Sequence, residues 1–210
     1  MKIGAMVAIL AIAEVVVQAK GEFGRLPVVT VYVQRGFSDM RLSVSHAEGI
    51  ASEMFSKAGV QIRWKTGSPK TDREAHPILI EITSETPETI HPRVFAYARV
   101  FERIHIIIFW DRIEQAAGKS LADQLLGHVL AHEITHLLQG IDRHSPEGIM
   151  KANWSAHDVV EMEHRPLAFD PVDVRLIHYG LAHYCLVGET ARSRECSTPI
   201  SHTNIASSKR

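Results

Sequence analysis

The 210-residue sequence is poor in cysteine: it has only Cys185 and Cys196, and both lie near its C-terminal end. Their spacing does not suit a metal-binding knuckle, so they do not indicate a metal site. In an exported chain the two thiols could form a disulfide that joins the C-terminal tail to the last helix, or they could stay reduced. The sequence supports these two alternatives equally.

The sequence also lacks an excess of charge of either sign. Its formal net charge is -1, and its Lys and Arg residues are scattered along the chain. This distribution gives no electrostatic reason to expect nucleic acid or an anionic membrane as a partner. Low-complexity tracts and internal repeats are absent as well, and a composition that is 45% hydrophobic suits a globular core.

The apolar run at the start of the chain is short. Lys2 precedes apolar residues 3–13, which are too few to span a membrane, and residues 17–19 place small side chains where a signal peptidase reads them. We therefore predict a signal peptide over residues 1–19 and a secreted or periplasmic protein with no membrane contact in its mature form. Glu14 is an unusual residue so close to the end of the apolar run of a signal peptide. An uncleaved membrane anchor is therefore the alternative to a cleaved signal peptide.

The rest of the chain is predicted to form one domain over residues 20–196, and we expect it to be a monomer. An upper subdomain would cover about 26–140, and a lower subdomain about 141–190. Residues 197–210 are polar and show no periodicity, so we predict a disordered tail.

The most informative stretch of the sequence is His132-Glu133-Ile134-Thr135-His136. Two histidines four residues apart on a helix project from one face, one turn apart, so both rings can bind one metal ion. Glu133 is placed beside the ion, where it can take a proton from an attacking water molecule. Apolar residues at helical spacing predict that this helix is half-buried. They are Leu125, Leu126, Val129, Leu130, Leu137 and Leu138.

A third metal ligand is expected from the turn after this helix. Gly140 supplies the residue that a helix needs at its C-terminal end, so the chain can turn back there. Asp142 and His144 both follow, and zinc accepts either a carboxylate or an imidazole, with a fourth position left to water. We place His144 first and keep Asp142 as the alternative. His105 and His128 are interpreted as core or supporting histidines.

The histidine pair, the glycine, the third histidine and the following Gly148-Ile149-Met150 together resemble the metzincin zinc peptidases and their Met-turn. More narrowly, residues 128–154 resemble a group of uncharacterised secreted bacterial proteins predicted to be zinc metallopeptidases. The spacing departs from the metzincin pattern at three positions. Gln139 and Asp142 stand where that family has its glycine and third ligand, and Ala152 stands where some members carry a tyrosine.

The resemblance implies an α+β, metzincin-like fold: a mixed twisted β-sheet with a backing helix and an active-site helix, then a smaller, mainly helical subdomain with the Met-turn. Met150 would pack beneath the imidazoles as an apolar floor. No cysteine precedes the histidine motif, so we expect no thiol-switch propeptide of the matrixin kind. Periodicity predicts strands at 28–33, 60–65, 78–83, 95–100 and 104–110, and helices at 44–58 and from Asp170-Pro171 to Gly188.

By the same resemblance, residues 95–100 would form the edge strand on which an extended peptide pairs, with Phe95, Tyr97 and Arg99 on that strand. The leading hypothesis is a secreted zinc endopeptidase that holds one zinc ion, hydrolyses protein or peptide substrates and uses Glu133 as general base and acid.

Two other hypotheses stay open. One is a gluzincin-type peptidase whose third ligand is a later carboxylate, Glu161 or Glu163. The other is a non-catalytic secreted protein of the same fold that binds zinc or a partner.

Overall fold

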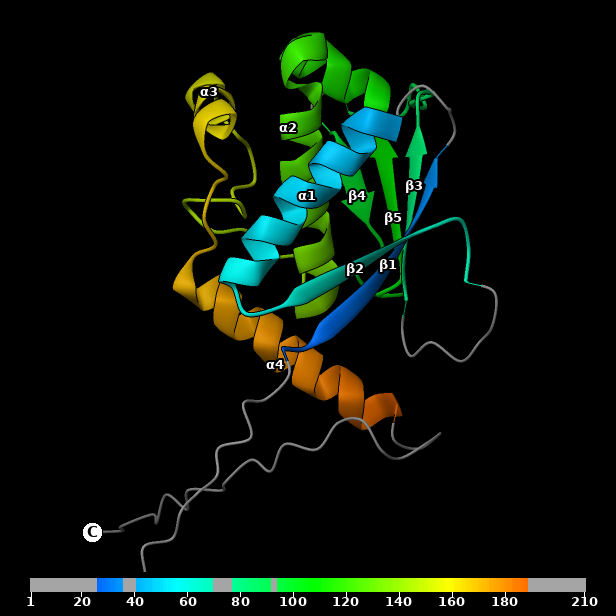
Figure 1. Cartoon of the computed structure of the whole chain (residues 1–210), viewed down its shortest axis with the longest axis vertical. Coiled ribbons are helices and arrows are strands. Elements are labelled where there is room, and N and C mark those ends of the chain that lie inside the picture. Colours follow the sequence, from blue (N-terminus) through cyan, green and yellow to red (C-terminus); the bar gives the residue numbers. More distant parts are fainter. Residues whose placement is uncertain (1–25, 36–40, 70–76, 92–93, 189–210) are drawn as a thin grey trace, which may run out of the picture.

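The computed structural model describes residues 26–35, 41–69, 77–91 and 94–188 (Figure 1). The predicted signal peptide and C-terminal tail, together with the side chains of both cysteines, lie outside the described residues. Within the described ranges, no helix combines the length and the apolar character needed to cross a bilayer.

The core of the fold is a five-stranded sheet in the order β2-β1-β3-β5-β4 (Figure 1). Neighbouring strands run parallel except for β4, which is antiparallel to β5 and forms one edge of the sheet. The strands are β1 Val28–Arg35, β2 Gln61–Thr66, β3 Ile78–Thr83, β4 Ala96–Ala98 and β5 His105–Phe109.

The strand sequences explain which strands lie in the middle of the sheet. β1, β3 and β5 are rich in valine and isoleucine, and β-branched side chains favour a pleated, buried surface. Val31, Ile80 and Ile108 are fully or almost fully buried in the core. At the other edge of the sheet, β2 alternates between exposed Gln61 and buried Ile62, as its sequence predicts.

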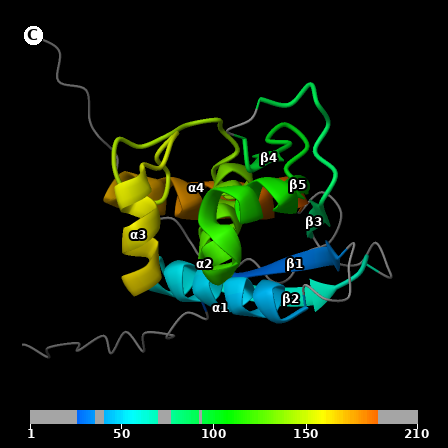
Figure 2. The ribbon, with the colours of Figure 1, turned by 90° about the horizontal axis from the view of Figure 1, so that it is seen from above.

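Among the residues that the structure describes, four helices accompany the sheet. Helices α1 and α2 pack against each other and against strands, whereas α3 and α4 contact α2. Figure 2 shows α3 on the side of α2 away from the strands, and in Figure 1 α4 crosses the lower end of α2. The helices are α1 Arg41–Lys57, α2 Trp110–Gln139, α3 Ala156–His164 and α4 Pro171–Gly188.

The predicted mixed α+β arrangement is confirmed, with three differences in detail. Trp110, which we placed in a strand, is the first residue of α2, and a kink at the non-helical Gly118 divides α2 into two helical segments. The edge strand is shorter than predicted, because a tight turn with a hydrogen bond from Val100 N–H to the Ala98 carbonyl follows it. The sequence analysis did not assign α3 its own element; a capping box at Ser155 and Asp158 starts this helix.

Helices α2 and α4 approach each other most closely at Gly180. This residue is buried, and a Cβ atom added to it would lie 1.8 Å from the carbonyl oxygen of Leu138 on α2. Only glycine permits this distance, so the crossing that holds α4 beneath the end of α2 depends on one missing methyl group.

We predict that Gly180→Ala lowers the free energy of unfolding by about 1–3 kcal/mol, because the added methyl group forces the two helices apart. Gly49→Ala on α1 is the matched control. Nothing lies within 4 Å of a Cβ there, so alanine should stabilise the helix by up to about 1 kcal/mol. Urea unfolding of both variants measures the difference. A Gly180→Ala protein with wild-type or higher stability would contradict the close packing.

Candidate metal centre

The C-terminal half of α2 runs through the interior of the protein. All residues from Leu125 to Gln139 are buried, which confirms the predicted apolar stripes and extends burial around the whole helix. The helix ends at Gly140 in the left-handed conformation, with φ 68° and ψ 24°, and the Gly140 N–H donates to the His136 carbonyl. The predicted glycine exit is confirmed, and the chain turns back there over the helix end.

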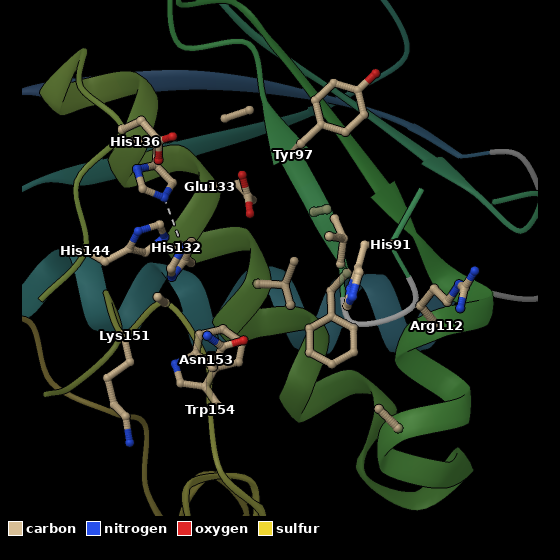
Figure 3. A pocket seen from close by; sticks show the side chains of 18 of the residues that line it. His91, Tyr97, Arg112, His132, Glu133, His136, His144, Lys151, Asn153 and Trp154 are labelled. Carbon is tan, nitrogen blue, oxygen red and sulfur yellow. Dashed lines mark hydrogen bonds between the residues drawn. The ribbon is translucent and has the colours of Figure 1, made fainter. Parts of the chain in front are cut away.

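This turn brings a third imidazole to the helical pair. One nitrogen from each of His132, His136 and His144 lies within 4.8 Å of the other two. The ring centroids are 4.7 Å apart for His132 and His136, 5.3 Å for His132 and His144, and 5.0 Å for His136 and His144. Figure 3 shows the three rings converging on one side of the cleft. Asp142 lines the same cleft but is not part of this cluster.

Backbone carbonyls fix the orientation of the two helical rings. His132 Nδ1 lies 2.8 Å from the Ile149 carbonyl oxygen, and His136 Nδ1 lies 3.3 Å from that of Ile141. Each Nδ1–H therefore donates to a carbonyl, which leaves each Nε2 with a lone pair and no proton.

The two Nε2 atoms face each other at 3.0 Å. Two unprotonated nitrogens at this distance repel each other unless a cation lies between them. A tetrahedral zinc ion with Zn–N bonds of about 2.0–2.1 Å separates two ligand nitrogens by roughly 3.3 Å. The residues present therefore fit a zinc ion in both donor type and spacing.

Burial keeps these donors in the form that binds metal. Loss of solvation lowers the pKa of His132 to about 4, against the opposing effect of its hydrogen bond to Ile149, and burial also lowers the pKa of His136. Neutral imidazole is the form that coordinates a cation. Both rings are thus ready to bind at neutral pH without first losing a proton.

Glu133 lies beside the imidazoles and faces β4 (Figure 3). Its side chain is buried, and loss of solvation raises the pKa of Glu133 to about 8, although a backbone hydrogen bond with Ala98 acts in the opposite direction. The carboxylate is absent from the cluster that could hold a metal. It is therefore positioned to exchange a proton with a molecule in the cleft.

The cluster opens into a cleft of about 970 Å³. Edge strand β4 forms one wall, and Trp154 lies opposite, with its ring 5.5 Å from that of His132. Phe95 and Tyr97, two of the three predicted substrate-strand residues, line this cleft. The third, Arg99, does not; it is exposed, pairs with Glu102 and lines an adjoining hollow.

A tight turn holds Met150 in the core. Met150 is fully buried, and its carbonyl accepts a hydrogen bond of 2.7 Å from the Ser145 N–H. The preceding Ile149 donates its N–H to the Ala168 carbonyl and accepts from the His132 ring. This short turn therefore connects the loop that carries His144 to Ile149, whose carbonyl orients the His132 ring.

The other histidines and carboxylates that the sequence singled out lie away from the cluster. His105 pairs with Glu102 at the surface, so it is not a core residue. Glu161 pairs with Arg165 along α3, and Glu163 is exposed. Neither glutamate joins the three histidines, so the geometry does not support the gluzincin-type alternative.

His128 is the core histidine that the sequence predicted. It has no exposed surface, its Nδ1 lies 2.7 Å from the Gln124 carbonyl, and its Nε2 accepts from the Leu167 N–H at 3.1 Å. With Nδ1 donating, both ring nitrogens have partners. The ring therefore joins α2 to the segment before α4.

Asp173 is a residue of the site that was not predicted from the sequence. This residue is fully buried in the first turn of α4, and it receives hydrogen bonds from Arg143 and Ser145, the two neighbours of His144. An acidic residue in the first turn of a helix is common because it complements the helix dipole. Its sequence position alone therefore gave no sign of a link to the metal centre.

No protein-family model and no curated protein matches the sequence. Among solved structures, the chain is similar to archaemetzincin from Methanopyrus kandleri, with a TM-score of 0.49 and 16% sequence identity. The match covers 76% of this chain and 98% of that one.

We predict that His128→Leu lowers stability and keeps the metal. At neutral pH the Leu167 N–H loses its partner, which costs about 1–3 kcal/mol. Burial lowers the pKa of His128 below the 6.5 of an unperturbed histidine, so its contribution is present above that pH and is lost as the pH falls toward the folded pKa. The stability difference between wild type and variant should narrow below about pH 6.5.

Urea unfolding at several pH values measures this narrowing, and metal analysis measures the zinc content. Loss of zinc from the His128→Leu protein would show that His128 is a ligand rather than a core residue.

Proposed function

We propose that the chain is a secreted zinc-dependent endopeptidase of the metzincin type, in which His132, His136 and His144 hold one zinc ion. The observation that carries this proposal is the convergence of three imidazoles, with nitrogens within 4.8 Å of one another, beside the buried carboxyl group of Glu133 in an open cleft. The sequence resemblance to metzincins supports a set of three histidines, with the third two residues later than in that family, and the turn at Met150 takes the role of their Met-turn.

A zinc ion held by these residues supplies two kinds of chemistry: it polarises a carbonyl oxygen, and it lowers the pKa of a water molecule to about 7. The chain contributes the geometry. Ile149 and Ile141 hold the two helical rings by their Nδ1 atoms, so their Nε2 atoms point into the cleft. Neither ring has to rotate when a ligand enters.

Glu133 is the general base and then the general acid. Its carboxylate takes a proton from the attacking water and delivers it to the nitrogen of the leaving amine, so the peptide bond breaks without a covalent intermediate. Its contact with the Ala98 backbone places this carboxyl group between the imidazoles and the edge strand. The substrate carbonyl would lie in the same gap.

The substrate peptide pairs with the outer edge of β4. The backbone groups of Phe95 and Arg99 bond to β5, and backbone direction alternates along a strand. The groups of Ala96 and Ala98 therefore point away from β5, toward the cleft. The backbone of Ala98 already bonds to Glu133 and Val100. Ala96 is therefore the pairing position, and Phe95 and Tyr97 line the cleft.

We predict that Glu133→Gln retains about one zinc ion per chain and lowers the turnover number by roughly 10²–10⁴-fold, because an amide cannot carry the proton. Cleavage of a fluorescence-quenched peptide library measures the activity, and metal analysis measures the zinc. Glu163→Gln, an exposed glutamate on α3, is the matched control and should keep wild-type activity.

Two results would contradict the proposal. Undiminished cleavage by the Glu133→Gln protein would show that another group moves the proton. A wild-type protein with full zinc occupancy that cleaves no peptide in the library would instead favour the non-catalytic zinc-binding hypothesis.

A further inference from the structure

The third imidazole is held differently from the other two. His132 and His136 lie on a buried helix, and a backbone carbonyl orients each ring. His144 lies in the loop after Gly140 and is exposed. Its ring lies close to the rings of His132 and His136. Its position therefore depends on what fixes the loop on either side of it.

One carboxylate fixes both sides. Arg143, the residue before His144, donates from Nη1 to Asp173 Oδ1 at 2.5 Å. Ser145, the residue after it, donates from Oγ to Asp173 Oδ2 at 2.6 Å. Arg143 also donates to the Ser145 hydroxyl at 3.1 Å, which closes a triangle of hydrogen bonds. We refer to Arg143, Ser145 and Asp173 as the loop clamp.

The environment of Asp173 makes the loop clamp rigid. The carboxylate is fully buried, and it lies in the first turn of α4, where the helix dipole favours a negative charge. Gln139, the last residue of α2, makes a longer contact of 3.4 Å with it. A buried carboxylate without its partners is very unfavourable, so the loop is strongly held in the conformation that supplies them.

We propose that Asp173 is a positioning residue for the third metal ligand. By binding the residues on both sides of His144, it sets the loop so that an arriving ion meets three imidazoles instead of the helical pair alone. This inference rests on the proposed metal site. It adds that the affinity of the site is set in part by a residue of α4 that never touches the ion.

A loop released from Asp173 has to be ordered when the metal binds, and this ordering opposes binding. Partners that orient metal ligands typically change metal affinity by about 10–100-fold when they are removed. We expect Asp173→Asn to weaken zinc binding by this factor. An amide at this position keeps the shape of the side chain, but only one of its two terminal atoms is an acceptor, so it cannot reproduce the separate bonds of Oδ1 with Arg143 and of Oδ2 with Ser145.

The test is the zinc dissociation constant of the full chain, measured by competition with a chromophoric chelator. Asp170→Asn is the matched control, because Asp170 also lies at the start of α4 and accepts from the Val172 N–H. Asp170 does not contact the loop clamp, so the zinc affinity of the Asp170→Asn protein should stay within about twofold of wild type. The same two substitutions are then made in a His144→Ala background.

If Asp173 acts through the third ligand, Asp173→Asn weakens zinc binding in the wild-type chain and has no further effect once His144 is absent. An equal loss in both backgrounds would overturn the proposal, because it would mean that the substitution damages the site as a whole. Unchanged affinity in the wild-type background would overturn it as well. If Asp173→Asn does not fold, Ser145→Ala removes the two hydrogen bonds of the clamp that involve the Ser145 hydroxyl, and it is judged by the same comparison.

A second measurement separates this inference from the proposed function. Amide hydrogen exchange of the metal-free protein reports directly on the Ser145 N–H, which bonds to Met150. Faster exchange in Asp173→Asn than in Asp170→Asn supports the clamp even if the wild type cleaves no peptide. Equal exchange in the two variants would show that Asp173 does not order the loop.

Discussion

Three imidazole nitrogens must be held in a small volume, and this constraint organises the rest of the structure. Two of the nitrogens face each other at 3.0 Å with lone pairs that repel in the absence of a cation. Such an arrangement persists only if the surrounding protein is rigid enough to impose it. The chain achieves this rigidity in two ways. The C-terminal half of α2 is buried on all sides, and Asp173 on α4 binds the loop that carries His144.

The supports of the site converge on the C-terminal end of α2. Gly140 ends the helix in the left-handed conformation, and the guanidinium group of Arg103 lies over it. Gly180 brings α4 against the Leu138 carbonyl, and Asp173 on the same helix binds the loop on both sides of His144. The sheet adds edge strand β4 opposite Glu133. The cleft therefore combines three imidazoles that could hold a metal ion, a buried carboxyl group and the edge of a strand.

The sequence predicted the local part of this site well. Spacing along a helix fixes which face a side chain occupies, so the pairing of His132 with His136 and the exit at Gly140 follow from neighbouring residues alone. The choice between His144 and Asp142 does not, because it depends on a loop shape imposed by Asp173 from a later helix. The limits of β4 and the extension of α2 back to Trp110 also depend on tertiary contacts, which the periodicity does not encode.

The most direct test of the account is X-ray absorption spectroscopy of the zinc-loaded protein, with His144→Ala and Asp142→Ala for comparison. The wild type and Asp142→Ala should both show three imidazole nitrogens at about 2.0 Å and one further light atom, whereas His144→Ala should show two imidazoles. A wild-type spectrum with two imidazoles and a carboxylate, altered by Asp142→Ala but not by His144→Ala, would contradict the three-histidine site.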